Sequence, residues 1–238
     1  MARFLQKKTF QKKGEAVAIP FKEINFENSM IFDNRETAGR LLGEWLKEKL
    51  GKEGNYIVLG IPRGGVVVAK KTAEILGVPL GALIVRKLGV PENPELAFGA
   101  IDQDGNIYLD EHTVEYFRLT PQVIQKVAQE ELKKIREREK KFERGLIRDF
   151  KDKDVIVVDD GVATGMTIKA GVEYLKRKGA KRVIVAVPVC PKETEEKLKR
   201  YANEVYCYYS TTTSPFAVGM FYKDFRQVED EEVQNLLQ

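Results

Sequence analysis

The chain has 238 residues, of which 43% are hydrophobic and 32% charged, and its 40 basic and 36 acidic side chains leave a net charge of +4. This balance is typical of a globular domain and excludes collagen, coiled coils and general disorder, and so small a net charge gives no reason to expect nucleic acid or a membrane as partner. Two cysteines and one histidine are too few for a disulfide scaffold or a zinc cluster, and no apolar run is long enough to cross a membrane, so we expect a soluble, cytoplasmic protein.

The first half of the chain alternates helices and strands. A helix is predicted at 33–50, where Asp33 and Glu36 have the spacing of a capping box and Gly51 can end the helix. The elements predicted after it are a strand at 56–61, a helix at 65–76, a strand at 82–85, a loop rich in proline and glycine at 87–99, and a small hairpin around 104–105.

The second half opens with the longest predicted helix, which begins at Thr120-Pro121 and runs to about residue 144. Its mixed charges predict a solvated face. Strands at 155–158, 182–187 and 204–208 then alternate with helices at 166–178 and 192–201. This pattern predicts one α/β domain over residues 1–238 with a central parallel sheet flanked by helices, in which ligands bind beyond the carboxyl ends of the strands.

The segment 155–167 carries the most specific chemistry. Asp159 and Asp160 follow four apolar residues and stand where the strand turns into a glycine-containing loop, so both can reach one vicinal diol. The loop at 161–167 opens a helix, whose free backbone N–H groups bind anions, and Thr164 and Thr167 add hydroxyl donors. A diol site beside an anion site predicts a pocket for a ribose 5-phosphate; the plain alternative is an ordinary strand, turn and helix.

Two further strand ends carry basic residues. Arg63 can bind phosphate oxygens through its planar fork, while Gly64 and Gly65 let the backbone approach a ligand closely. Arg86 and Lys87 follow the strand predicted at 82–85. Taken alone, the first segment is also compatible with a plain turn and the second with a soluble strand end.

The segment 155–167 resembles the fingerprint of the type I phosphoribosyltransferase family, in which four apolar residues and two acids precede Gly-x-Ala/Thr-Thr-Gly-x-Thr/Ser. Gly-Ile-Pro-Arg-Gly-Gly, Val-Arg-Lys-Leu-Gly, Asn-Pro-Glu and the Phe-Tyr-x-Asp-Phe tail are similar to a group within that family whose acceptors are unassigned. The resemblance implies phosphoribosyl pyrophosphate as donor, Mg²⁺ as cofactor, a nucleobase or related amine as acceptor, and a homodimer. A protein that binds the donor only to regulate a partner remains the alternative.

The resemblance also implies roles for individual residues. Segments at about 1–30 and 209–238 would form tails and a hood over the base. The implied site comprises Asp159 and Asp160, which hold the ribose hydroxyls and reach the metal indirectly; Ala163, Thr164, Gly165, Met166 and Thr167 for the 5-phosphate; Arg63, Gly64 and Gly65 for pyrophosphate; Arg86 and Lys87 as catalytic cations; and Phe216, Phe221, Tyr222 and Phe225 as hood aromatics.

Three further expectations concern conformation and stability. By resemblance, the peptide bond between Pro62 and Arg63 is expected to be cis. The loop at 87–99 is expected to have little regular structure and to close over the site during turnover. Abundant lysine and glutamate are typical of proteins from hyperthermophiles and predict a melting temperature above the mesophilic range.

Overall fold

The computed structural model describes residues 8–12, 15–19 and 31–238, and the chain divides into two compact units, 1–31 and 32–238. In the first unit, β1 (Lys8–Lys12) and β2 (Glu15–Ile19) form an antiparallel hairpin. Most residues expected to add an N-terminal part to the hood lie outside the described ranges, so that role stays a prediction.

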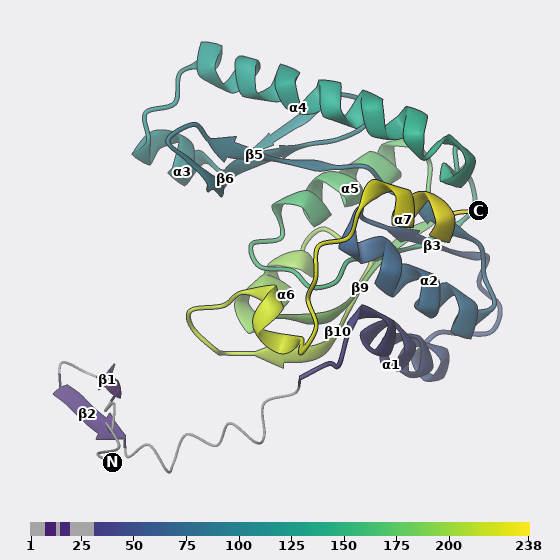
Figure 1. Ribbon diagram of the computed structural model, residues 1–238, viewed down its shortest axis with the longest axis horizontal. Coiled ribbons are helices and arrows are strands. Elements are labelled where there is room, and N and C mark those ends of the chain that lie inside the picture. The colour runs from purple at the N-terminus through teal and green to yellow at the C-terminus, as the bar shows by residue number, and fades with distance from the viewer. Residues whose placement is uncertain (1–7, 13–14, 20–30) are drawn as a thin grey trace. The chain divides into compact units, whose positions relative to one another are not determined.

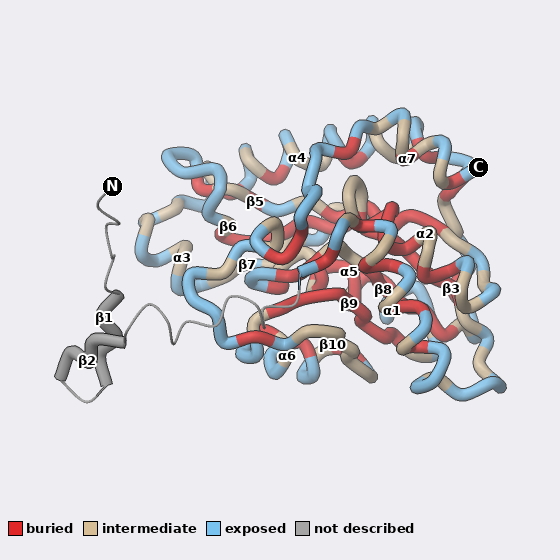
Figure 2. The backbone as a smooth tube through the Cα atoms, turned by 60° about the horizontal axis from the view of Figure 1, so that its bottom comes forward, coloured by how far each residue is buried: buried red, intermediate tan, exposed pale blue. Residues whose placement is uncertain are grey.

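A five-stranded, wholly parallel sheet forms the centre of the second unit, in the order β10-β9-β8-β3-β4 (Figure 1). Its inner strands are buried almost throughout (Figure 2), as expected for a parallel sheet covered on both faces, whereas β10 at the edge is mostly half-buried. The predicted fold class is therefore confirmed. The strands are β3 (Tyr56–Gly60), β4 (Leu80–Ala82), β8 (Asp154–Val158), β9 (Arg182–Pro191) and β10 (Glu204–Thr211).

Alternating strand residues bury the helices on opposite faces of this sheet. Ile57 and Leu59 of β3 face the cluster that contains residues of α5, whereas Val58 faces the cluster that contains residues of α1 and α2. The helices of the second unit that flank the sheet are α1 (Arg35–Lys49), α2 (Gly64–Leu76), α5 (Met166–Arg177) and α6 (Lys192–Leu198).

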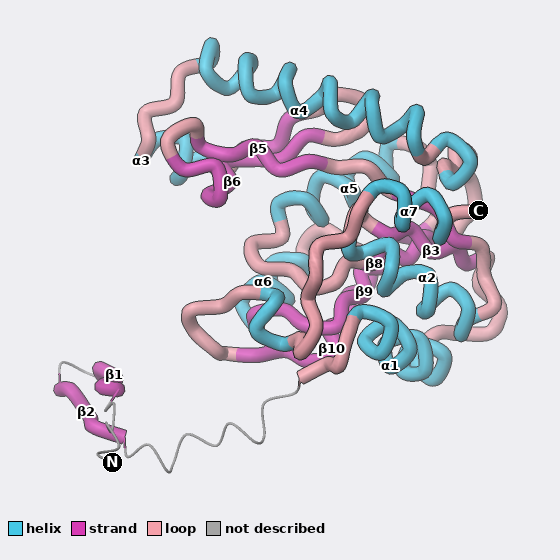
Figure 3. The backbone as a smooth tube through the Cα atoms, in the orientation of Figure 1, coloured by secondary structure: helices cyan, strands magenta, loops and turns pink. Residues whose placement is uncertain are grey.

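In the chain, a second layer is inserted between β4 and β8. Figure 3 shows its strands β5 and β6 beside the long helix α4. Three antiparallel strands, in the order β5-β6-β7, pack against the long helix α4 through a separate apolar cluster. The C-terminal helix contributes Val233 to the same cluster. The elements are β5 (Arg86–Val90), β6 (Asn93–Ile101), β7 (Ile107–Leu109), α3 (Glu111–Tyr116), α4 (Pro121–Lys141) and α7 (Asp230–Leu236), with short 3-10 helices at Glu143–Gly145 and Val218–Phe221.

The expectation of an irregular loop at 87–99 is wrong. These residues form most of the β5–β6 hairpin, because Leu88, Val90 and Phe98 bury their side chains in the cluster beneath α4. The proline and glycine residues fit the hairpin: Pro91 lies in the turn, and the register shifts on either side of Gly89, where a Cβ atom would lie 2.5 Å from the carbonyl oxygen of Pro94. Closure of this hairpin over the site stays a prediction.

Several predicted boundaries also move. The N-cap of α1 is Asn34 rather than Asp33, and its side chain accepts a hydrogen bond from the Thr37 N–H at 2.8 Å. The strand predicted at 82–85 ends at Ala82, and β9 and β10 extend beyond their predicted ends. Among the described residues, no helix combines the length and apolar character needed to span a membrane.

Candidate functional site

The candidate site lies where the carboxyl ends of β3 and β8 meet. The strands pair in register at Gly60 and Val158, and the Ile61 N–H donates to the Val158 carbonyl at 3.0 Å. This pairing sets the loop after β3 against the two carboxylates after β8. A Cβ atom on Gly64 would lie 2.4 Å from Asp160 Oδ2. One on Gly65 would lie 2.7 Å from Asp159 Oδ1, so both positions require glycine for this approach.

The two carboxylates are held in different ways. Asp159 Oδ1 accepts a hydrogen bond from the Asp160 backbone N–H at 2.8 Å, and Asp160 Oδ2 accepts one from Arg35 Nε at 2.9 Å. Burial, with the neighbouring Asp160 charge, raises the pKa of Asp159 well above its usual range. Burial also raises the pKa of Asp160, although the Arg35 charge opposes this shift. The free protein therefore stabilises the ionised forms of these two carboxylates poorly, and a positively charged ligand or metal would stabilise them.

Arg35 joins this carboxylate to the C-terminal segment. Its Nη1 donates to the Arg226 carbonyl at 2.7 Å, and its guanidinium lies 4.0 Å from the centre of the Phe225 ring. From the other side, the Tyr222 hydroxyl donates to the Asp160 backbone carbonyl at 2.5 Å. Sequence reasoning missed Arg35. The residue could have been noticed because it is an arginine in the first turn of a helix, where a positive charge interacts unfavourably with the helix dipole. Such an arginine suggests an acidic partner elsewhere in the fold.

The predicted anion loop has the expected local form. Helix α5 begins at Met166 after Gly165, which has a φ of 84° and leaves the helix start without a side-chain cap. The Thr194 hydroxyl fixes the loop by donating to the Ala163 carbonyl at 2.6 Å. Ala163 and Thr164 are exposed and line a pocket of about 650 Å³, together with Pro191, Lys192, Glu193, Glu196, residues 211–214 and Phe216.

The predicted basic residues lie in three different surroundings. Arg63 follows a cis peptide bond after Pro62, as expected, and its Nη1 lies 3.8 Å from a Glu229 carboxylate oxygen. Arg86 Nε donates to Glu131 of α4 at 2.7 Å. Lys87 is exposed on the hairpin, where its Nζ lies 3.2 Å from Glu95 Oε2.

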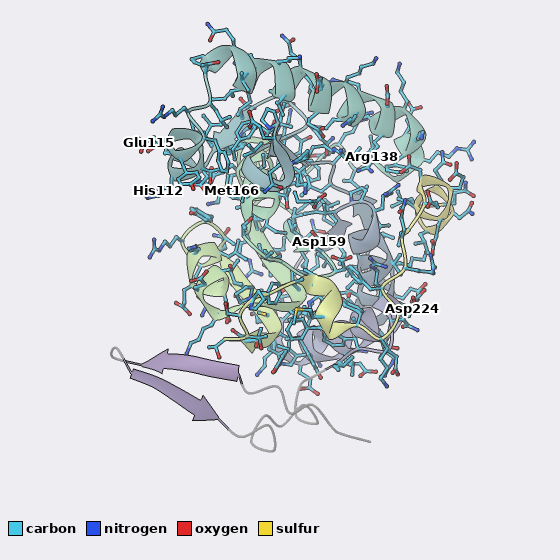
Figure 4. All side chains as sticks on the ribbon, turned by 60° about the vertical axis from the view of Figure 1, so that its left-hand side comes forward. His112, Glu115, Arg138, Asp159, Met166 and Asp224 are labelled. Atoms are coloured by element: carbon cyan, nitrogen blue, oxygen red, sulfur yellow. The ribbon has the colours of Figure 1, made fainter. Side chains whose placement is uncertain are left out.

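The four hood candidates differ in how accessible they are. Phe221 and Tyr222 are buried, with exposed fractions of 4% and 6%, so they help to form the aromatic cluster beneath the C-terminal segment. Phe216 stacks on Phe221 with 5.3 Å between ring centres and also lines the 650 Å³ pocket. Phe225 keeps 38% of its surface exposed. His112 is exposed on α3 and lies well apart from Asp159 (Figure 4).

The residues at this site suit a magnesium ion that arrives with a phosphate-bearing ligand. Nowhere in the described ranges do three or more histidine, cysteine or acidic side chains converge as a metal cluster. The site does offer two adjacent carboxylates, Asp159 and Asp160, and burial raises the pKa of both. Magnesium is commonly held by one or two carboxylates, water and substrate phosphates, so these donors fit it.

Comparison with known proteins agrees with this geometry. The sequence profile described as "phosphoribosyl transferase domain" matches residues 27–224. The chain is 42% identical over 204 residues to proteins named "Putative phosphoribosyl transferase" from two strains of Mycobacterium tuberculosis, and it spans 45% of their length. It is also 38% identical to TT1426 from Thermus thermophilus, whose crystal structure superposes with a TM-score of 0.71 over 87% of this chain and 98% of that one.

Proposed function

We propose that this chain, which belongs to the phosphoribosyl transferase domain family, transfers a 5-phosphoribosyl group from phosphoribosyl pyrophosphate to a nitrogen of a nucleobase or related amine and releases pyrophosphate. The observation that carries the proposal is the juxtaposition of Asp159 and Asp160 with Gly64 and Gly65 at the paired ends of β8 and β3. An uncapped helix start follows the carboxylates within the same loop, so a diol and a phosphate can be bound side by side.

Each group then has a defined part in binding. Asp159 and Asp160 would accept hydrogen bonds from the two ribose hydroxyls, and Ala163 to Thr167 would bind the 5-phosphate through backbone N–H groups and hydroxyls. Arg63, Gly64 and Gly65, with Arg86 and Lys87, would hold the pyrophosphate. Phe216 lines the pocket beside the phosphate loop and is the best placed of the hood candidates to contact an acceptor. We further propose that the protein acts as a homodimer.

Catalysis would depend mainly on positioned charge. As the bond to pyrophosphate breaks, the ribosyl carbon becomes cationic and the departing group gains negative charge, which Arg63 and Arg86 would stabilise. When bound, magnesium would neutralise part of that departing charge; Asp159 and Asp160 would hold it through the ribose hydroxyls or water. Exclusion of water by the C-terminal segment and by the β5–β6 hairpin would protect the cationic carbon from hydrolysis.

The decisive experiment measures pyrophosphate release from protein, magnesium and donor in the presence of a panel of nucleobases and small amines. We expect release with at least one acceptor and none without an acceptor. The variant Asp160→Asn should lose release, whereas Asp152→Asn, which changes an exposed aspartate, should retain it. Binding of the donor without release on any acceptor would instead support the regulatory alternative.

Among the acceptors, hypoxanthine and guanine are expected to be poor. In family members specific for these bases, the position of Ala163 generally carries an acid that exchanges a proton with the purine. A methyl group cannot exchange a proton, so that route is closed here. Turnover should be about a hundredfold below that with the best acceptor, because acid–base assistance of this kind contributes about 10²–10⁴ in rate. Steady-state rates across the panel check this, and an equal rate with hypoxanthine would contradict it.

A further inference from the structure

Arginine side chains from three separate elements converge beside the loop that follows β3. Arg63 lies in that loop, Arg86 begins β5, and Arg138 lies two helical turns after Glu131, the Arg86 partner, on α4. Glu229 and Asp230 are neighbours in the chain and face Arg63 and Arg138 respectively, which brings these two arginines to one place. Burial lowers the pKa of Arg138, and the positive charges of Arg86 and Arg63 lower it further.

This cluster matches its three arginines with three carboxylates and adds two exposed lysines. Its ion pairs join five cations to three carboxylates: Arg63, Arg86, Lys134, Arg138 and Lys141 against Glu131, Glu229 and Asp230. The Arg138 side chain is only 14% exposed. The two lysine side chains are 52% and 50% exposed, so water solvates the surplus charge, and an anionic ligand would bind the arginines by replacing a carboxylate partner.

The contacts that Glu229 and Asp230 make with the two arginines are long, although Asp230 Oδ2 also accepts a hydrogen bond from Lys141 Nζ at 2.8 Å. Arg63 Nη1 and Glu229 Oε2 are 3.8 Å apart, and Arg138 Nε and Asp230 Oδ1 are 3.9 Å apart, both beyond hydrogen-bond length. Asp230 Oδ1 is buried without any hydrogen-bond partner in the described part of the chain, and no hydrogen bond from the Arg138 guanidinium to a described residue is present. The donors of both arginines therefore remain available to a ligand.

We propose that Arg138 binds the pyrophosphate group of the donor together with Arg63 and Arg86, and that the carboxylates of Glu229 and Asp230 compete with this group for the arginines. The proposal rests on the proposed function, since it concerns the same donor. Arg63 of the cluster directly precedes Gly64, the residue that approaches Asp160. An elongated pyrophosphate could therefore extend from the diol site toward Arg138. Two neighbouring side chains thus have opposite effects, with Arg138 favouring the anion and Asp230 opposing it.

The test measures dissociation constants of inorganic pyrophosphate and of ribose 5-phosphate by calorimetry in the presence of magnesium. Arg138→Gln should weaken pyrophosphate binding about tenfold, the usual effect of losing a charge-assisted hydrogen bond, and leave ribose 5-phosphate unchanged. Arg138→Lys should restore part of the loss. Asp230→Asn should tighten pyrophosphate binding about threefold, as expected for the loss of a weak competing ion pair.

Two matched variants control for general effects of charge. Arg136→Gln removes an exposed arginine from the same helix, and Glu231→Gln removes an exposed acid from the first turn of α7. Both should leave the two dissociation constants unchanged. If the cluster only fastens α7 to α4, Arg138→Gln and Asp230→Asn will both lower the melting temperature without changing pyrophosphate affinity, and this outcome would overturn the proposal.

The same measurements separate this inference from the proposed function. Wild-type binding of both ligands, with pyrophosphate affinity unaffected by Arg138→Gln, would remove Arg138 from the site and leave the proposed function standing. Wild-type protein that binds neither ligand would contradict the proposed function, and the arginine site with it. Should Arg138→Gln fail to fold, the tightening by Asp230→Asn still decides, because equal or weaker pyrophosphate binding in that variant would overturn the competition.

Discussion

Gly64→Ala is expected to reduce kcat/KM for the donor by about a hundredfold while the protein remains folded. The added Cβ atom would lie 2.4 Å from Asp160 Oδ2 and 2.6 Å from Arg35 Nε. Because the crowded atoms are the ends of side chains, the backbone can stay in place, but the ion pair between Arg35 and Asp160 must open. A displacement of about 1 Å at a positioned group can cost about 10²-fold in rate.

Gly51→Ala is the matched control, because a Cβ atom there would meet no atom within 4 Å. Its kinetic constants and melting temperature should equal those of the wild type. The two variants are compared by steady-state kinetics and by thermal unfolding in the absence of ligand. Full activity of Gly64→Ala would show that the approach of this loop to Asp160 does not matter to the reaction.

Asp159→Asn is expected to lower activity by two orders of magnitude or more and yet to stabilise the free protein. The activity falls because the amide cannot supply the charge that the ribosyl centre and the metal require, a loss of about 10²–10³ in rate for one positioned electrostatic group. The stability rises because burial and Asp160 penalise the charged form of Asp159. Asparagine keeps an oxygen to accept the hydrogen bond from the Asp160 N–H.

The sign of the pH dependence follows from the raised pKa of Asp159. Between the usual aspartate value of 3.8 and the raised value, the folded protein holds a proton that the unfolded chain has lost. The free energy of unfolding therefore falls as the pH rises through this interval. Asp159→Asn removes this contribution, and near neutral pH the variant should be more stable by about 1 kcal/mol.

Denaturant unfolding at several pH values, with a chelator and no donor, measures this difference. Asp152→Asn serves as the control, since Asp152 is exposed, and asparagine tolerates its positive φ of 60°. The control should keep the wild-type pH dependence. An Asp159→Asn protein that is less stable than the wild type at neutral pH would contradict the assigned cost of the buried charge.

Much of the central sheet could be predicted from sequence because β3, β8 and β9 are apolar and each is followed by a helix. Gly77, for example, ends α2 with a φ of 67°, and a glycine after an apolar helical run is a common sign of a helix end. The β5–β6 hairpin was missed because its prolines and glycines obscure the alternation of buried and exposed residues. Leu88 and Phe98 are buried only because they pack in the same apolar cluster as a distant helix. That helix, α4, lies further along the chain, so local pattern could not reveal the contact.

The candidate site likewise has a part that could be predicted from sequence and a part that could not. Asp159, Asp160 and the loop up to Thr167 are contiguous, and their spacing alone indicated a diol site beside a phosphate site. Arg35 could not be found by spacing, because it reaches Asp160 from a helix far away in sequence, and the proposed role of Arg138 likewise depends on contacts between distant segments. The mixed charges of α4 were interpreted as a solvated face, and this is true of Arg136 but not of Arg138, whose side chain is mostly buried.

Residues 61–153 separate β3 from β8, the strand that pairs with it. During synthesis on the ribosome, the sheet therefore stays incomplete until these residues have been added. Until β8 emerges, β3 has β4 on one side only, and the other side is an open edge with Ile57, Val58 and Leu59 exposed to other chains. The inserted β5–β7 layer and α4 emerge during this interval and can fold on local contacts. Synthesis of this protein therefore includes a period of vulnerability to aggregation, which ends when β8 and its two carboxylates leave the exit tunnel.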